Sequence, residues 1–173
     1  MYICINEEIT NATVNRILEI LLTKDKEDKI IVVFVNSQGG DVDSSYAIYE
    51  LLRLSGCKII TYTINECFSS AVIVFLAGEE RYATDYSTFM IHEPFHEYES
   101  KGATTMTANS YKINLKELQE NTDEYFKLIS KHSILTPQKI KTYIAKSEEG
   151  DWYIKSSQAK KLGLVTKIGV PLN

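Results

Sequence analysis

An α/β fold is predicted by three features of the first half of the chain. Residues 30–35 (IIVVFV) form a continuous β-branched run, which is typical of a strand in a parallel sheet covered on both faces. The run ends in a turn that contains Gly39 and Gly40. Segments with helical spacing of apolar residues lie on either side of it, and strands that alternate with helices indicate βαβ units.

The individual elements follow from local patterns taken in chain order. Strands are expected at residues 2–5, 30–35, 57–63, 81–83, 88–92, 152–154 and 164–168, where β-prone runs are bounded by turn residues. Helices are expected at residues 9–22, 41–56, 69–78 and 105–131, from Pro137 onward, and from Ser156 or Ser157 to Gly163. Residues 95–103 are polar and leave the compact body. No repeat or linker interrupts the pattern, so a single domain over residues 1–173 is expected.

Composition excludes several classes of protein. The 173 residues are 44% hydrophobic and 24% charged, with a net charge of −4, which is ordinary for a globular chain and argues against a nucleic-acid partner. The longest apolar run, residues 71–77, is far shorter than the ~20 residues of a membrane span. No signal peptide is recognisable. Three cysteines without C-x-x-C spacing favour reduced thiols in the cytoplasm over disulfides or a zinc site, and no metal or cofactor is expected.

Few side chains could act as a general base. The histidines are His92, His96 and His132, and His92 follows a predicted strand, where α/β folds place functional groups. Ser69 and Ser70 stand where a strand gives way to an apolar helix. Either serine could be a nucleophile beside unpaired helix N–H groups or simply a helix cap.

Two further positions have equally open interpretations. Gly39 and Gly40 could form only a tight turn, or they could let a substrate approach and present an N–H to an oxyanion. Asp151 could be a turn residue or the group that orients a histidine. The neighbouring Glu148 and Glu149 are interpreted as solvated surface.

Three stretches together resemble the Clp protease proteolytic subunit, over about residues 2–168. VVFVNSQGGDVDSSYAIYELL resembles the family's strand, N-S-P-G-G turn and following helix. ECFSSAVIVFLAGEERYATDYSTFMIHEP resembles its nucleophile helix and M-I-H-Q-P segment. GDWYIKSSQAKKLGLV resembles the segment with the aspartate and the A-x-x-x-G-L signature. The resemblance implies the α/β fold of the Clp and crotonase proteins, built from repeated β-β-α and βαβ units with a protruding handle at about residues 95–131.

The resemblance also implies roles for single residues. Counted without a gap from Gly40, the family's nucleophile falls on Ser69; His92 matches the general base and Asp151 the third member of the triad. The N–H groups of Gly40 and Ser70 match the oxyanion hole. Gln38 stands where the family has proline, and Glu66 and Phe68 replace smaller or neutral residues, which is expected to change the shape of the pocket.

The implied function is that of a serine endopeptidase that hydrolyses unfolded polypeptides inside a ring or double-ring homo-oligomer, through an acyl-enzyme. The residues that match begin at the family's first strand, so its N-terminal segment, which forms axial loops and helps engage a ring-shaped ATPase, is expected to be absent. The resemblance therefore supports a Clp-type ATPase partner less than it supports the ring. The alternatives are a catalytically silent ring subunit that keeps the fold, and a crotonase-type acyl-CoA hydratase or isomerase, which needs no serine nucleophile.

Overall fold

A computed structural model of the chain describes residues 1–95 and 108–169. The strands are β1 (Tyr2–Ile5), β2 (Ile30–Val35), β3 (Lys58–Thr63), β4 (Glu66–Phe68), β5 (Glu80–Ala83), β6 (Thr88–Ile91), β7 (Trp152–Lys155) and β8 (Lys167–Ile168). The helices are α1 (Asn11–Thr23), α2 (Val42–Leu54), α3 (Ala71–Phe75), α4 (Ala108–Lys131), α5 (Pro137–Lys146) and α6 (Ser156–Lys161), with a 3₁₀ turn at Glu148–Gly150. Among these residues, no helix is both long and apolar enough to cross a membrane.

The strands form two sheets. Five strands pair in parallel in the order β1-β2-β3-β5-β8, and a smaller sheet has the order β4-β6-β7. In the small sheet β4 is parallel to β6, whereas β6 and β7 are antiparallel. The predicted α/β class is confirmed. The small sheet is held together largely by β6, whose neighbours lie far from each other in the sequence.

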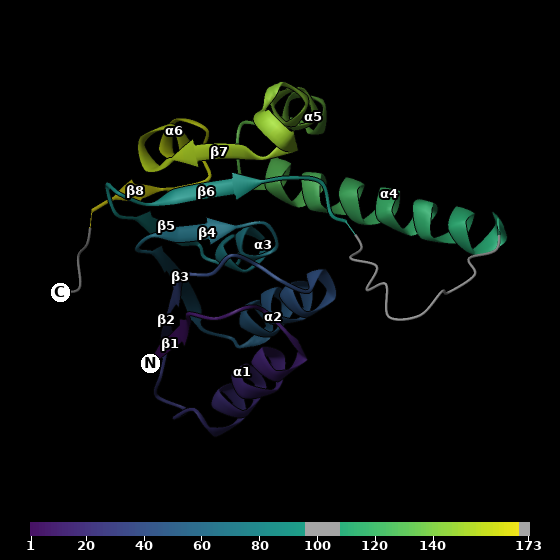
Figure 1. Cartoon of the computed structure of the whole chain (residues 1–173). Coiled ribbons are helices and arrows are strands. Elements are labelled where there is room, and N and C mark those ends of the chain that lie inside the picture. The colour runs from purple at the N-terminus through teal and green to yellow at the C-terminus, as the bar shows by residue number, and fades with distance from the viewer. Residues whose placement is uncertain (96–107, 170–173) are drawn as a thin grey trace.

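Helices cover one face of the five-stranded sheet (Figure 1). On β2, Ile31, Val33 and Val35 are completely buried on that face, whereas Ile30 is 46% exposed on the other. The expectation that this strand is covered on both faces was therefore wrong. On the other face, Phe34 of β2 belongs to a row of stacked and tilted aromatic rings that crosses four strands: Tyr2, Phe34, Tyr62 and Tyr82.

Two other predictions need correction, and one strand was missed. The helix expected at residues 69–78 is only α3: it cannot begin at Ser69, whose backbone is left-handed, and after Phe75 the chain leaves the helix in a turn. The strand expected at residues 164–168 is reduced to β8, and β4 was not predicted. Of the expected handle, α4 is described and its outer half projects beyond the body (Figure 1). The part of the polar excursion at residues 96–107 lies outside the described residues.

Candidate active site

Ser69 lies in the turn between β4 and α3. Its φ of 52° is a conformation that costs an L-residue about 1–3 kcal/mol, so surrounding contacts must hold it. The Ser69 N–H donates to the Met90 carbonyl oxygen at 2.8 Å, and the Ser69 carbonyl accepts from the Tyr125 hydroxyl at 2.9 Å. Backbone anchors on both sides thus fix this turn.

The structure separates the two adjacent serines. The Ser69 hydroxyl lies 2.6 Å from His92 Nε2. Ser70 takes the N-cap position of α3 without making a side-chain cap bond, and its hydroxyl donates to the Gly40 carbonyl oxygen at 3.0 Å. Only Ser69 presents its oxygen to a base.

His92 lies between Ser69 and Asp151. Its Nδ1 is 3.3 Å from Asp151 Oδ1. Because an ionised carboxylate only accepts, a proton on Nδ1 faces Asp151, and Nε2 is left to accept the Ser69 proton. His92 directly follows β6 and Asp151 directly precedes β7, and Ile91 pairs with Trp152 across these strands. The antiparallel register therefore brings the two side chains together.

Gly39 and Gly40 lie tightly against their neighbours. A Cβ on Gly39 would lie 2.8 Å from the Phe68 carbonyl oxygen and 3.0 Å from Ser69 Cβ. A Cβ on Gly40 would lie 2.4 Å from the Ile9 carbonyl oxygen. Only glycine permits both approaches. The approach at Gly39 seats the glycine turn against the Ser69 turn, and the approach at Gly40 seats it against Ile9.

Two backbone donors remain free beside the serine. In the part of the chain that the structure describes, the N–H groups of Gly40 and Ser70 have no acceptor. These are the two groups that the resemblance assigns to an oxyanion hole. Free N–H groups on either side of a nucleophile are what a developing negative charge needs.

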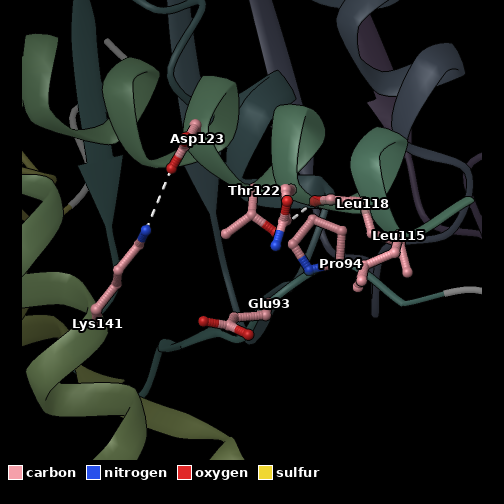
Figure 2. A pocket seen from close by; sticks show the side chains of 8 residues that line it. Glu93, Pro94, Leu115, Leu118, Thr122, Asp123 and Lys141 are labelled. Carbon is pink, nitrogen blue, oxygen red and sulfur yellow. Dashed lines mark hydrogen bonds and ion pairs between the residues drawn. The ribbon is translucent and has the colours of Figure 1, made fainter. Parts of the chain in front are cut away.

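Two cavities near α4 have Pro94 as a shared lining residue. The small cavity that Ser69, His92 and Tyr125 line also touches Pro94. Pro94 and Leu118 then line a cavity of about 540 Å³ between α4, α5 and the segment after β6 (Figure 2).

The ion pair between Lys141 Nζ and Asp123 Oδ1, 3.2 Å apart, bridges α4 and α5 at one side of that cavity (Figure 2). It ties together the two helices that form the wall. Leu115 and Leu118 supply an apolar lining from α4.

A second groove of about 570 Å³ lies on the other side, beside Gly39 and Gly40, and Glu66 is among its lining residues. Phe68, which was expected to alter the pocket, packs edge-on against Tyr153 with ring centroids 5.7 Å apart. Its bulk is therefore taken up by the small sheet, whereas Glu66 does reach the groove.

The remaining candidates lie away from Ser69 or outside the described residues. The Nε2 atom of His132 lies 3.2 Å from the Tyr49 hydroxyl. Burial lowers the pKa of His132 to about 4, and the charges of Arg81, Lys131 and Arg53 act in the same direction. Burial raises the pKa of the Cys67 thiol, so this residue is not a reactive thiolate. His96 lies outside the described residues.

Tyr125 is the residue at this site that sequence reasoning missed. It falls on the apolar side of a long helix, where an aromatic residue is interpreted as core, and no local signal links it to Ser69.

Among the described residues, no group of three His, Cys, Asp or Glu side chains is placed to share a metal ion.

Comparisons with known proteins identify relatives of the chain. The family model for Clp protease matches residues 1–171. The ATP-dependent Clp protease proteolytic subunit 2 of Borreliella burgdorferi is 33% identical over 142 residues, which cover 81% of this chain and 67% of that protein. Subunit 1 of Chlamydia felis is 30% identical over 170 residues, covering 96% and 79%. A solved structure of a ClpP1 mutant from Listeria monocytogenes superposes with a TM-score of 0.83 at 21% identity, over 99% of this chain and 92% of that one.

Proposed function

The chain belongs to the Clp protease family, and we propose that it is a serine endopeptidase in which Ser69, His92 and Asp151 form the catalytic triad. The observation that carries the proposal is the 2.6 Å contact between Ser69 Oγ and His92 Nε2. A hydroxyl that donates to a neutral imidazole can lose its proton as it attacks a carbonyl carbon.

The reaction proceeds through an acyl-enzyme. His92 accepts the Ser69 proton as Oγ bonds to the scissile carbonyl carbon, and the carbonyl oxygen becomes an oxyanion. The N–H groups of Gly40 and Ser70 stabilise this charge, each by about 3–4 kcal/mol if well placed. His92 then protonates the leaving amine as the C–N bond breaks, and water attacks the acyl-enzyme by the same steps in reverse order.

Asp151 orients the imidazole and stabilises its protonated form. Its carboxylate oxygen faces Nδ1 at 3.3 Å, so it favours the tautomer in which Nε2 accepts the serine proton. This role needs no transfer of the proton to Asp151.

The substrate is an extended polypeptide segment. Two cavities near the site, one lined by Pro94 and Leu118 and the other by Gly39 and Gly40, have room for side chains of such a segment. A homo-oligomeric ring, with α4 as part of the contact between rings, is the assembly that family membership favours. A Clp-type ATPase is the partner that the names of the relatives suggest.

Fluorophosphonate labelling with peptide mapping tests the nucleophile. Stoichiometric modification of Ser69 in the wild type, absent from Ser69→Ala, is expected. Ser70→Ala is the matched control, because it keeps the backbone N–H of residue 70 and should still be labelled at Ser69. Absence of labelling in a folded, oligomeric wild type would favour a silent subunit, and labelling at Ser70 would refute the assignment.

A further inference from the structure

The peptide unit between Ser69 and Ser70 is held through its carbonyl oxygen. The Ser69 C=O and the Ser70 N–H belong to the same planar group, so whatever fixes one end also fixes the other. The carbonyl accepts from the Tyr125 hydroxyl at 2.9 Å and from the Val72 N–H at 3.0 Å. The direction in which the Ser70 N–H points is set from the far side of the peptide.

The other donor of the oxyanion hole is held in the same way. The Gly39 carbonyl, which shares a peptide unit with the Gly40 N–H, accepts from the Ile9 N–H at 2.8 Å. That contact comes from main chain, which any residue at position 9 except proline would supply. The Ser69 carbonyl, in contrast, is restrained by the Tyr125 side chain as well as by the Val72 N–H, so a single substitution can remove one of its two hydrogen bonds.

Tyr125 is suited to be a permanent donor. The side chain is 2% exposed and lies on α4, 56 residues away in sequence from its acceptor. Burial raises the pKa of its phenol well above 10, and nearby Cys67 and Tyr46 act in the same direction. The hydroxyl therefore keeps its proton throughout the pH range in which a serine peptidase works.

We propose that Tyr125 is a positioning residue for the oxyanion hole: its hydroxyl aligns and polarises the Ser69–Ser70 peptide so that the Ser70 N–H donates to the transition-state oxygen. The inference rests on the proposed peptidase function. A hydrogen bond to a peptide carbonyl strengthens the N–H at the other end of the unit. It also opposes rotation of a peptide that adjoins the strained φ of Ser69.

Saturation kinetics of fluorophosphonate labelling separate positioning from binding. The Ser69 Oγ–P bond forms as the P–F bond breaks, His92 takes the serine proton, and the phosphonyl oxygen occupies the hole. Tyr125→Phe is expected to lower the maximal labelling rate about tenfold, a fraction of the 10²–10³ lost with a whole donor, and to leave the half-saturating probe concentration unchanged.

Tyr49→Phe is the matched control. It also removes one hydroxyl of a buried tyrosine and its hydrogen bond, here the one to His132, without touching Ser69, so its labelling should match the wild type.

Each outcome discriminates. Equal maximal rates in Tyr125→Phe and wild type, with both folded, would overturn the role of Tyr125 and leave the peptidase proposal standing. Equal slowing in Tyr49→Phe would assign the effect to general loosening and would also overturn it. An unreactive wild type would overturn the peptidase function itself.

Discussion

Replacement of Gly39 by alanine tests the close approach between the glycine turn and the nucleophile. The new Cβ would lie 2.8 Å from the Phe68 carbonyl oxygen, 3.0 Å from Ser69 Cβ and 3.1 Å from the Ser70 nitrogen. A carbon and a carbonyl oxygen need about 3.3 Å, so backbone on one side must move by roughly half an ångström. The groups that would move are those that form the proposed hole.

The magnitude follows from two separable terms. A φ of +101° costs an L-residue about 1–3 kcal/mol, and crowding at a packed site typically adds about 1–3 kcal/mol. We expect a loss of about 3 kcal/mol in the free energy of unfolding. A misplacement of 1 Å can lower catalysis about 10²-fold, so half of that predicts labelling of Ser69 about tenfold slower.

Gly56→Ala separates these terms. Gly56 also has positive φ, +71°, but nothing lies within 4 Å of its added Cβ, so only the backbone term of about 1–3 kcal/mol applies. Urea unfolding at equal protomer concentration gives the two stabilities, and fluorophosphonate labelling gives the rates. The argument from close approach would be refuted if Gly39→Ala were labelled at the wild-type rate, or if labelling of Gly56→Ala were slowed to the same extent.

Two further predictions concern stability. Arg81 is 7% exposed and donates to the carbonyl oxygens of Gly78, His132, Gly163 and Leu164. Arg81→Met should therefore lower the free energy of unfolding by about 4 kcal/mol, whereas Arg53→Met, which loses only an exposed ion pair, should change it by less than about 1 kcal/mol. Because the pKa of His132 is about 4 in the folded chain, the unfolded chain binds more protons between pH 6.5 and 4. The free energy of unfolding should therefore decrease as the pH is lowered through this range. The decrease is at most about 1.4 kcal/mol per pH unit, and smaller here because the ring is only half-buried. Equilibrium unfolding from pH 7.5 to 4 should show a shallower slope for His132→Gln, and an identical slope would contradict the assignment.

Strong local patterns predicted most of the fold. The strand β2 covers the residues that its β-branched run predicts, Ile30–Val35. The helix α5 begins at the predicted Pro137, and the Thr136 hydroxyl accepts from the Lys139 N–H. Such elements depend on neighbours in sequence, so a window of residues contains the information.

The elements that were missed depend on distant partners. β4 has only three residues and exists because Cys67 pairs with Phe89 on β6 and with Ser37 beyond β2. Which face of the main sheet stays open likewise depends on where the helices pack, because an apolar strand sequence does not indicate which of its faces they will cover. On the open face, Phe34 of that run packs in a row of aromatic rings from four strands and not against a helix.

The candidate site, like the fold, could be predicted only in part from local sequence. The residues alone left Ser69 and Ser70 equivalent, because both precede an apolar helix. The difference is a backbone rotation at Ser69 that turns one hydroxyl to His92 and the other to Gly40. That rotation is a consequence of tertiary contacts, so only the resemblance to a family could choose between the serines beforehand.

The two groups that hold the backbone of Ser69 belong to different elements of the fold. β6 supplies both the Met90 carbonyl that holds the Ser69 N–H and, two residues later, His92 itself. A small shift of β6 would carry serine and base together and preserve their 2.6 Å contact. Tyr125 belongs instead to α4, so a shift of α4 relative to β6 would turn the Ser69–Ser70 peptide without moving His92. Perturbations of α4 should therefore weaken stabilisation of the oxyanion while the Ser69–His92 contact stays intact. In that case, changes that reach α4 from outside the body would alter the rate of the proposed acylation before they altered the geometry of the proposed triad.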